Sequence, residues 1–249
     1  KRTFFIKVLP VNDAPVIAHI PSIGTEIGQM SPEIPITVTD VDSDVSQITL
    51  SVTSGNASLV PNDSEHVIVT QEGPGQWKLR LKPMDGKIGT ARITVEATDA
   101  EGATGRHQFD LVVNNLWLSG LEPSQGTMTP TFDPYILGYT VVYSGWLPQV
   151  NVTATTQDDD VRLRIRRSDT LDEWRDAQSG RLSPAITLDD SGGSVEVEVY
   201  SPVTGISKSY LLTFVRSKST VTELVDLSIN PGRLQPEFQP DRTTYSATV

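Results

Sequence analysis

The stretch from Ala91 to Ala97 reads Ala-Arg-Ile-Thr-Val-Glu-Ala, with an apolar residue at every second position. Successive side chains of a β-strand point to opposite faces, so this alternation predicts a strand with one buried and one solvated face. Trp77, Leu79 and Leu81 alternate in the same way, which predicts that Trp77 belongs to the core. Since no window of the chain holds a sustained helical period, we expect an all-β fold made of antiparallel sheets.

Runs of the same kind recur between Pro15 and Asn114 at the spacing typical of a β-sandwich. Turn-forming residues separate them, as in Gly73-Pro74-Gly75 and Asp85-Gly86. We therefore expect one antiparallel sandwich over residues 11–114. The runs cover residues 34–39, 47–53, 66–70, 76–82, 91–97 and 107–113.

A second unit of strand-like runs covers residues 115–217, and its opening is repeated further along the chain. Eight residues between Leu118 and Tyr139 recur 106 residues later, between Leu224 and Tyr245 (224 − 118 = 106). Eight matches in one register are hard to obtain by chance, so we expect residues 218–249 to be the truncated start of a third sandwich. The pairs are Leu118/Leu224, Leu121/Leu227, Gly126/Gly232, Met128/Leu234, Pro130/Pro236, Phe132/Phe238, Pro134/Pro240 and Tyr139/Tyr245. Only residues 169–181 could form a helical turn.

The segment Val11–Val16 reads Val-Asn-Asp-Ala-Pro-Val and predicts a junction between domains. Its Asn-Asp pair and its proline favour a short extended link over a helix. The strand-like run in residues 3–8 has no partner before it, and a lone strand cannot satisfy its backbone groups. We expect residues 1–10 to be the last strand of a preceding domain, and the whole chain to be an extended array of tandem sandwiches.

The first unit resembles the bacterial cadherin-like (Ig-like) tandem repeats. Those repeats commonly begin with a linker similar to Val11–Val16 and carry an Asp-x-Asp segment after an early strand, here at residues 40–44. A Thr-Asp-x-x-Gly turn precedes their last strand, here at residues 98–102. The resemblance covers residues 11–114 and implies an Ig-type sandwich.

The second unit resembles a different family, the cadherin-like β-sandwich repeats. Their pattern runs Leu-x-x-Leu, then Gly-x-Leu-x-Pro-x-Phe-x-Pro and a strand led by tyrosine, and ends in Tyr-x-Leu-x-Phe-x-Arg. Residues 118–139 and 210–216 follow it, with Met128 in place of a leucine. Such modules are similar to those of large exported bacterial adhesins, surface-layer components and carbohydrate-active enzymes, where the resemblance implies a spacer role outside the cell.

The composition excludes several classes of function. The net charge of −11 disfavours binding to the phosphate backbone of nucleic acids. The chain has no cysteine, which excludes disulfides, thiol catalysis and cysteine-ligated zinc. No run of about 18 apolar residues is present, so we expect no membrane span. The three histidines are scattered and lack the context of a serine nucleophile, so we do not expect an enzyme.

Five aspartates form the candidate metal site. Regular alternation of strand direction would bring Asp13 at the start of the first unit, the segment 40–44 and the turn at Asp99 to one pole. Calcium takes 6–8 oxygen ligands from carboxylates, carbonyls and water, so such a cluster is a possible calcium site that stiffens the joint with the preceding domain. The five are Asp13, Asp40, Asp42, Asp44 and Asp99.

The alternative is that these aspartates are only turn formers in solvent. The spacing of Asp40, Asp42 and Asp44 also matches the start of an EF-hand loop. That loop needs a glycine at its sixth position and a glutamate at its twelfth, where this chain has Val45 and Ser51. We conclude that it is not an EF-hand.

Three further features of the sequence concern candidate sites and contacts. The acidic stretches 158–160 and 189–190 are expected at the pole that faces the third unit, chiefly as solvated turns. Trp146 and Trp174 are the candidate platforms for binding a glycan, since both lie in turn-like segments. Trp117 is out of phase with Leu118 and Leu121, which suggests packing at the junction between the two units.

Two functions remain open at this stage. The favoured one is a structural spacer in a large bacterial surface, filament or adhesin-type protein, whose partners are the neighbouring repeats. The alternative is an accessory module of a secreted protein that binds carbohydrate through Trp146 or Trp174. A further possibility is strand pairing between copies, in which residues 3–8 of one molecule pair with residues 224–249 of another.

Overall fold

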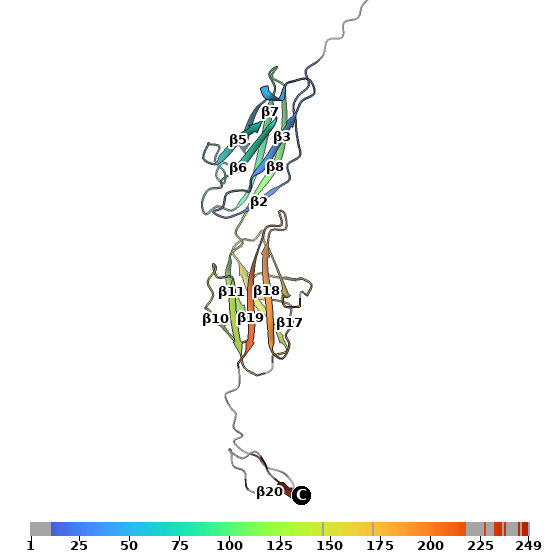
Figure 1. Cartoon of the computed structure of the whole chain (residues 1–249). Helices are drawn as coiled ribbons and strands as arrows, with labels where there is room; N and C mark the ends of the chain where they lie inside the picture. The colour runs from blue at the N-terminus through green and yellow to red at the C-terminus, as the bar shows by residue number, and fades with distance from the viewer. Residues whose placement is uncertain are drawn as a thin grey trace, which may run out of the picture.

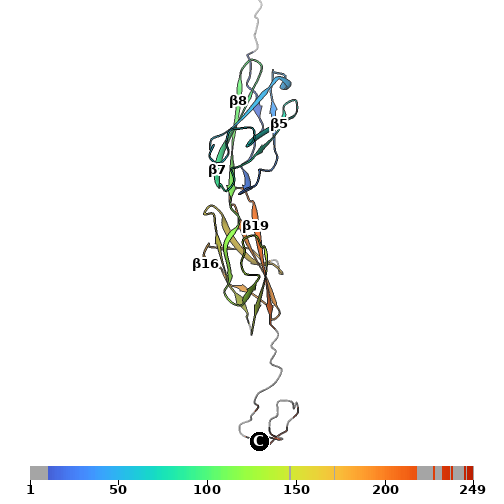
Figure 2. The same cartoon turned by 90° about the vertical axis from the view of Figure 1, so that its left-hand side faces the viewer.

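The computed structural model describes residues 11–145, 147–170 and 172–217, and beyond them residues 227, 232–235, 237, 244 and 246–248. Two β-sandwiches lie end to end, so that the molecule is elongated (Figure 1). After a quarter turn about the vertical axis, the two sandwiches are again seen end to end (Figure 2). Residues 1–10, expected to be a strand, lie outside the described residues, and so does most of 218–249, on which the expected pairing between copies depends.

The first sandwich has two four-stranded sheets. One has the order β1 (Val16–Ile17), β3 (Ile34–Thr39), β6 (Gln76–Leu81) and β5 (Val67–Gly73). The other has the order β2 (Ile23–Glu26), β8 (Thr104–Asn114), β7 (Gly89–Thr98) and β4 (Thr49–Ser54). A 3-10 turn, η1 (Val45–Gln47), precedes β4. The chain leaves the first sheet after β1 and joins the second beside β8, so that β2 and β8 are parallel where we expected antiparallel strands.

The second sandwich is built on a six-stranded sheet, which faces two smaller ones. Residues 169–181, the only segment that could have formed a helical turn, hold a strand and the start of another and no helix among the described residues. The large sheet has the order β10 (Thr127–Thr129), β11 (Gly138–Tyr143), β19 (Ser207–Arg216), β18 (Gly192–Tyr200), β14 (Arg162–Arg167) and β15 (Arg175–Ala177). The small sheets are β16 (Arg181–Leu182), β13 (Val152–Thr156) and β9 (Leu118–Pro123), and β12 (Gln149–Val150) with β17 (Ile186–Thr187).

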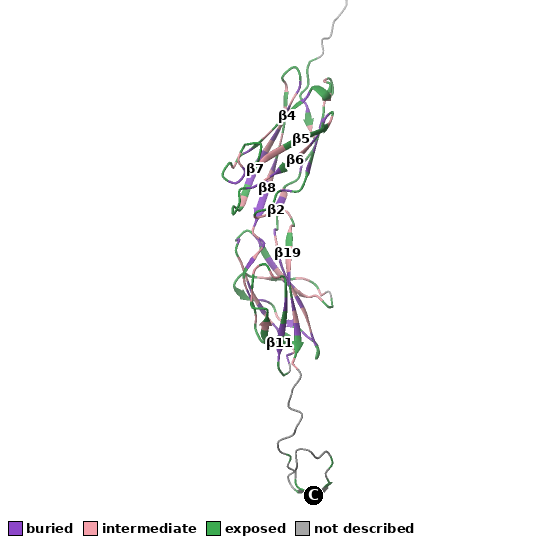
Figure 3. Cartoon of the chain, turned by 60° about the vertical axis from the view of Figure 1, so that its left-hand side comes forward, coloured by how far each residue is buried: buried purple, intermediate pink, exposed green. Residues whose placement is uncertain are grey.

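Each sandwich has its own hydrophobic core. In β7 the apolar residues of the alternating stretch are fully buried, while the residues between them face outward. Trp77 lies in the same core, as its phase predicted. Buried and exposed segments alternate along the strands of both units (Figure 3). In the described part of the chain the only helical element is η1, so the all-β prediction is confirmed.

The repeat of 106 residues reappears in the pairing of strands. In the second sandwich β10 pairs with β11, with Thr127 opposite Val142. Near the end of the chain β20 (Arg233–Gln235) pairs with β21 (Ser246–Thr248), with Arg233 opposite Thr248. Both members of the second pair lie 106 residues after those of the first (233 − 127 = 248 − 142 = 106), so this hairpin repeats the earlier one residue for residue.

The hydroxyl of Tyr210 connects three segments inside the second core. The Tyr210 side chain is fully buried, and its hydroxyl accepts a hydrogen bond from the backbone N–H of Leu118 at 3.0 Å. The same hydroxyl donates to the carbonyl of Pro134 at 2.9 Å. Burial raises the pKa of Tyr210 to about 12, so the donor proton is retained at neutral pH.

We expect Tyr210→Phe to lower the free energy of unfolding of the second sandwich by about 1–3 kcal/mol, because the buried N–H of Leu118 and the partly buried carbonyl of Pro134 lose their partner. Urea unfolding would measure the change. Tyr135→Phe is the matched control, since the Tyr135 side chain is 74% exposed. Equal unfolding midpoints for the two variants would contradict the structural role of the Tyr210 hydroxyl.

Candidate functional site

One pole of the first sandwich, where the described chain begins at residue 11, brings together three segments far apart in sequence (Figure 1). Asn12 Nδ2 donates to Asp99 Oδ2 at 2.8 Å, which ties the start of the domain to the turn after β7. The backbone N–H of Asp13 donates to Asp42 Oδ2 at 3.1 Å, which ties it to the loop after β3. We call this cluster of residues 12–13, 40–44 and 99–103 the acidic pole.

Backbone N–H groups hold two of its carboxylates. Asp40 Oδ1 accepts from the N–H of Ser43 at 2.9 Å and from that of Asp42 at 3.1 Å. The bond from Ser43 is the main cause that lowers the pKa of Asp40. Asp44 caps η1 by accepting from the N–H of Ser46 at 2.9 Å, and this bond likewise lowers the pKa of Asp44. Both carboxylates are therefore ionised at neutral pH.

Asp99 is the buried member of the acidic pole, with 6% of its surface exposed. Burial acts to raise its pKa, but hydrogen bonds from Asn12 and from the backbone around Ala103 outweigh burial, so that the pKa is lowered. Hydrogen-bond donors of the protein itself thus stabilise the charged carboxylate of Asp99 beneath the turn at residues 99–103.

The fit of the acidic pole to a calcium ion is incomplete. Among the described residues, no three carboxylate or imidazole side chains lie close enough together to hold a metal ion. The Oδ2 atom of Asp40 is buried and has no hydrogen-bond partner among these residues. Calcium binding at the acidic pole therefore stays a prediction.

The acidic stretch 158–160 lies at the joint between the sandwiches, and the prediction that it faces the third unit is wrong. Asp158 Oδ2 accepts from Asn114 Nδ2 at 3.0 Å and from the backbone N–H of Asn115 at 2.9 Å. The reason is strand direction: β19 leaves the joint, β11 runs parallel to it, and β13 therefore returns to the joint. The stretch 189–190 precedes β18, which runs toward the joint, and so lies at the opposite pole.

Trp174 is partly buried beside the outer face of β14. The guanidinium carbons of Arg164 and Arg166 lie 4.6 and 4.2 Å from the centroid of its ring. These arginines also pair with Glu198 and Glu196 on β18. A sugar ring stacking on Trp174 would compete with these contacts. Trp146, the other proposed glycan platform, lies outside the described residues.

The joint itself is a site that sequence reasoning found only in part. Gly24 of β2 lies so close to the turn 201–206 of the second sandwich that an added Cβ would be 2.3 Å from Thr204 Oγ1. Glycine is thus required there by close approach, a condition that no local sequence pattern reveals.

An ion pair connects the two sandwiches beside Gly24, and an aromatic ring of the second sandwich lies against its lysine. Lys208 Nζ lies 3.0 Å from Glu26 Oε2, and the two side chains are only 13% and 27% exposed. The same Nζ lies 3.6 Å from the ring centroid of Trp117, which places Trp117 at the junction as its phase suggested. Trp117 in turn packs edge-on against Tyr135 at 4.9 Å. Because Lys208 and Trp117 both belong to the second sandwich, the ring holds the lysine in place, and the ion pair with Glu26 makes the contact with the first sandwich.

Each of the two sandwiches matches a known family model. Residues 12–112 match the bacterial Ig domain, and residues 110–217 match the cadherin-like beta sandwich domain. The two domains stand in tandem. Domains of these families are typically non-enzymatic and indicate a structural or adhesion-type module. Bacterial Ig domains are often part of extracellular surface proteins. Within the described residues no helix is long and apolar enough to cross a membrane.

Similar solved structures are tandem immunoglobulin domains of low identity. The titin domains z1z2 in complex with telethonin are 13% identical, with a TM-score of 0.33, and the match covers 83% of this chain and 98% of that one. The N-terminal Ig1-2 module of the Drosophila receptor protein tyrosine phosphatase DLAR is 11% identical, with a TM-score of 0.34 and coverage of 83% and 100%. These likenesses concern the fold alone. No curated protein matches the chain.

We expect calcium to raise the midpoint of thermal unfolding of the chain, and a chelator to remove the gain. A ligand at 100 times its dissociation constant adds about 2.7 kcal/mol to the free energy of unfolding. Asp40→Asn should abolish the gain, because it removes the charge next to the unpartnered oxygen. Asp63→Asn is the control, since Asp63 accepts backbone hydrogen bonds in a different turn of the same sandwich. A midpoint that moves by less than about one degree would refute the calcium site.

Proposed function

We propose that this chain is a structural spacer of a longer bacterial surface protein, in which it holds neighbouring domains at a fixed distance and angle outside the cell. The two tandem family matches support the structural part of this proposal. The joint supports its mechanical part. A flexible linker would leave the domains free to rotate, whereas here β8 ends at Asn114 and β9 begins at Leu118, so the connection is short.

The observation that carries the proposal is the set of specific contacts across the joint. The turn 201–206 packs closely against Gly24, and Lys208 forms an ion pair with Glu26. Asp158 accepts a hydrogen bond from the backbone N–H of Asn115, which belongs to the connection between the domains. Surface ion pairs add little to stability, but a pair that is mostly removed from solvent and lies beside a ring is worth more. Together the contacts define a single orientation between the two sandwiches.

Calcium at the acidic pole would extend the same role to the joint with a preceding domain. Asn12 and Asp13 belong to the link itself, so an ion held there would restrict the link directly. An adhesive role is the second candidate. Tryptophan platforms give it little support, since Trp174 already contacts Arg164 and Arg166.

Distance measurements between two spin labels would test the fixed orientation. The chain has no cysteine, so Gln71→Cys on the first sandwich and Arg181→Cys on the second give two labels only. Both residues are exposed. We expect one narrow distance distribution for the parent chain.

Gly24→Ala should broaden or shift this distribution, because its new methyl group meets Thr204. Adding Thr204→Gly should restore it, since the obstructing side chain is then absent. Lys208→Ala should broaden it too, while Lys82→Ala, which breaks an ion pair within the first sandwich, should leave it unchanged. A broad distribution in the parent chain would overturn the spacer proposal.

A further inference from the structure

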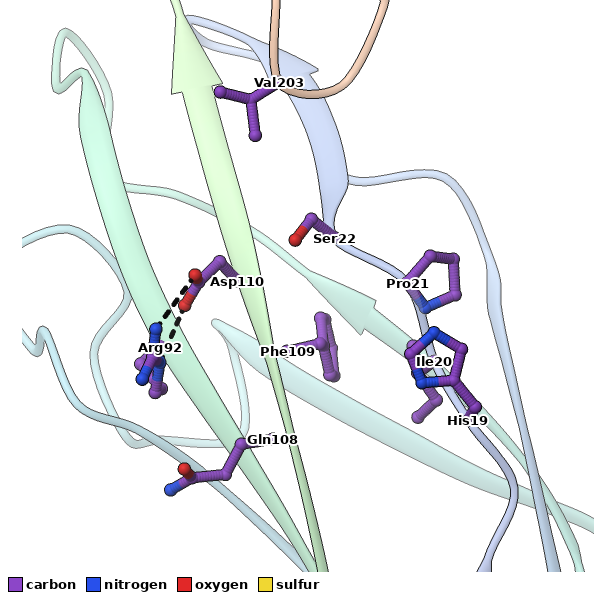
Figure 4. Close-up of a pocket in the computed structure, with 9 residues that line it drawn as sticks. All are labelled: His19, Ile20, Pro21, Ser22, Arg92, Gln108, Phe109, Asp110 and Val203. Atoms are coloured by element: carbon purple, nitrogen blue, oxygen red, sulfur yellow. Dashed lines mark hydrogen bonds and ion pairs between the residues drawn. The ribbon is translucent and has the colours of Figure 1, made fainter.

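A hollow beside the joint holds a structural ion pair. It has a volume of about 630 Å³ and lies between β8 and the segment 19–22 (Figure 4). Arg92 and Asp110 line it, and Arg92 donates hydrogen bonds of 2.9 and 3.1 Å to the two carboxylate oxygens of Asp110. Because these two charges satisfy each other, they connect β7 to β8 and leave little charge for a ligand.

A more reactive group is the peptide bond between Asp133 and Pro134, in the turn between β10 and β11. It is the only Asp–Pro bond in the chain. The proline nitrogen belongs to a tertiary amide, so it accepts a proton and leaves more readily than the nitrogen of an ordinary peptide bond. A carboxylate is also a nucleophile, and that of an aspartate reaches its own main-chain carbonyl carbon through a five-membered ring. The bond can therefore be cut by the side chain that precedes it.

The Asp133 side chain is folded back toward this bond. Its Oδ1 accepts a hydrogen bond of 2.9 Å from the backbone N–H of Tyr135, which holds the exposed carboxylate against the backbone that follows it. Aspartate before proline is also a common turn former, so a purely structural role is the alternative. In the register of the 106-residue repeat, however, Gln239 stands before Pro240 (133 + 106 = 239), so the repeat does not require an aspartate at this position.

Two donors hold the carbonyl oxygen of Asp133, on which negative charge develops during such an attack. The hydroxyl of Tyr139, a residue only 3% exposed, donates to it at 2.6 Å, and the backbone N–H of Ile136 donates at 3.1 Å. On the other side of the bond, the Tyr210 hydroxyl donates to the carbonyl of Pro134 at 2.9 Å. Donors placed in advance at a developing oxyanion are a major source of catalysis in acyl transfer. The fold thus supplies what this cleavage needs.

We propose that the second sandwich cleaves its own chain between Asp133 and Pro134. A carboxylate oxygen of Asp133 bonds to the main-chain carbonyl carbon of the same residue, and Tyr139 and Ile136 stabilise the charged carbonyl oxygen. The C–N bond to Pro134 then breaks, and the proline nitrogen takes up a proton from solvent. The cyclic anhydride that remains is hydrolysed by one water molecule to the two carboxylates of a C-terminal Asp133. Each chain reacts once, and the net change is the hydrolysis of one peptide bond.

The cut leaves the sandwich assembled in the absence of load. The upstream part keeps the first sandwich with β9 and β10, and these two strands stay paired with β13 and β11 of the downstream part. Because no covalent bond then joins the parts, tension separates them where an intact sandwich would transmit it. The spacer acquires a release point. This consequence rests on the proposed function, whereas the cleavage itself does not.

Mass spectrometry of the full chain, incubated in mildly acidic buffer, would test the inference. We expect two fragments, residues 1–133 and 134–249, whose masses add up to that of the parent plus one water. The comparison is the same chain in concentrated guanidinium chloride, where the bond is present but the donors are not positioned. Cleavage of the folded chain should be faster by at least about tenfold. Equal rates, or no cleavage, would overturn the inference and leave the spacer proposal intact.

Paired variants assign the chemistry. Asp133→Gln, which copies the repeat at Gln239, should abolish cleavage. Tyr139→Phe should slow it by at least about tenfold in the folded chain and leave the rate in denaturant unchanged. Tyr143→Phe is the matched control, because Tyr143 lies on the same strand, is 5% exposed and has a hydroxyl without a partner among the described residues. Circular dichroism shows whether each variant is folded. A folded Tyr139→Phe chain that cleaves like the parent would overturn the catalytic role of the fold, and if that variant does not fold, the comparison with denaturant decides.

Discussion

The close approach of Gly24 to Thr204 is the constraint on which the arrangement of the two sandwiches depends. With any side chain at position 24 the turn 201–206 could not lie where it does. With the turn in this position, Lys208 reaches Glu26. This position also leaves Asn114 buried against Asp158, so that the connection between the domains is held by a charged acceptor. The absence of a Cβ atom at position 24 thus allows these polar contacts between the two sandwiches to form.

The acidic pole illustrates two ways to accommodate neighbouring carboxylates. A cation can bind them, or backbone N–H groups can each take one oxygen. Asp40 and Asp44 use the second way, Asp99 accepts from the side-chain amide of Asn12 as well as from backbone N–H groups, and the lowered pKa values follow from these bonds. Among the buried carboxylate oxygens of the acidic pole, Asp40 Oδ2 is the one without a partner in the described residues. The same turn residues that suggest an ion site in a sequence can therefore be satisfied by their own loop, and spacing alone does not separate the two cases.

The fold could be predicted from sequence because burial in a sheet follows a period of two. In β7 each residue expected inside is buried, and Trp77 lies with them. The order and direction of the strands were harder to predict from the sequence. The parallel pairing of β2 with β8 depends on where the chain changes sheets, and the placement of Asp158 at the joint depends on strand direction in the second sandwich. Gly24 and Lys208 were missed, since their importance comes from contact between domains and leaves no local pattern.

The register shared by the hairpins β10–β11 and β20–β21 has a consequence for how such proteins change over generations. Each pair in the later hairpin is displaced by 106 residues from a pair in the earlier one. Recombination between two such copies removes or adds one whole unit and leaves every strand opposite its correct partner. The length of a protein built in this way can thus vary in steps of one domain, while single-residue slips, which would turn each side chain to the wrong face, are avoided.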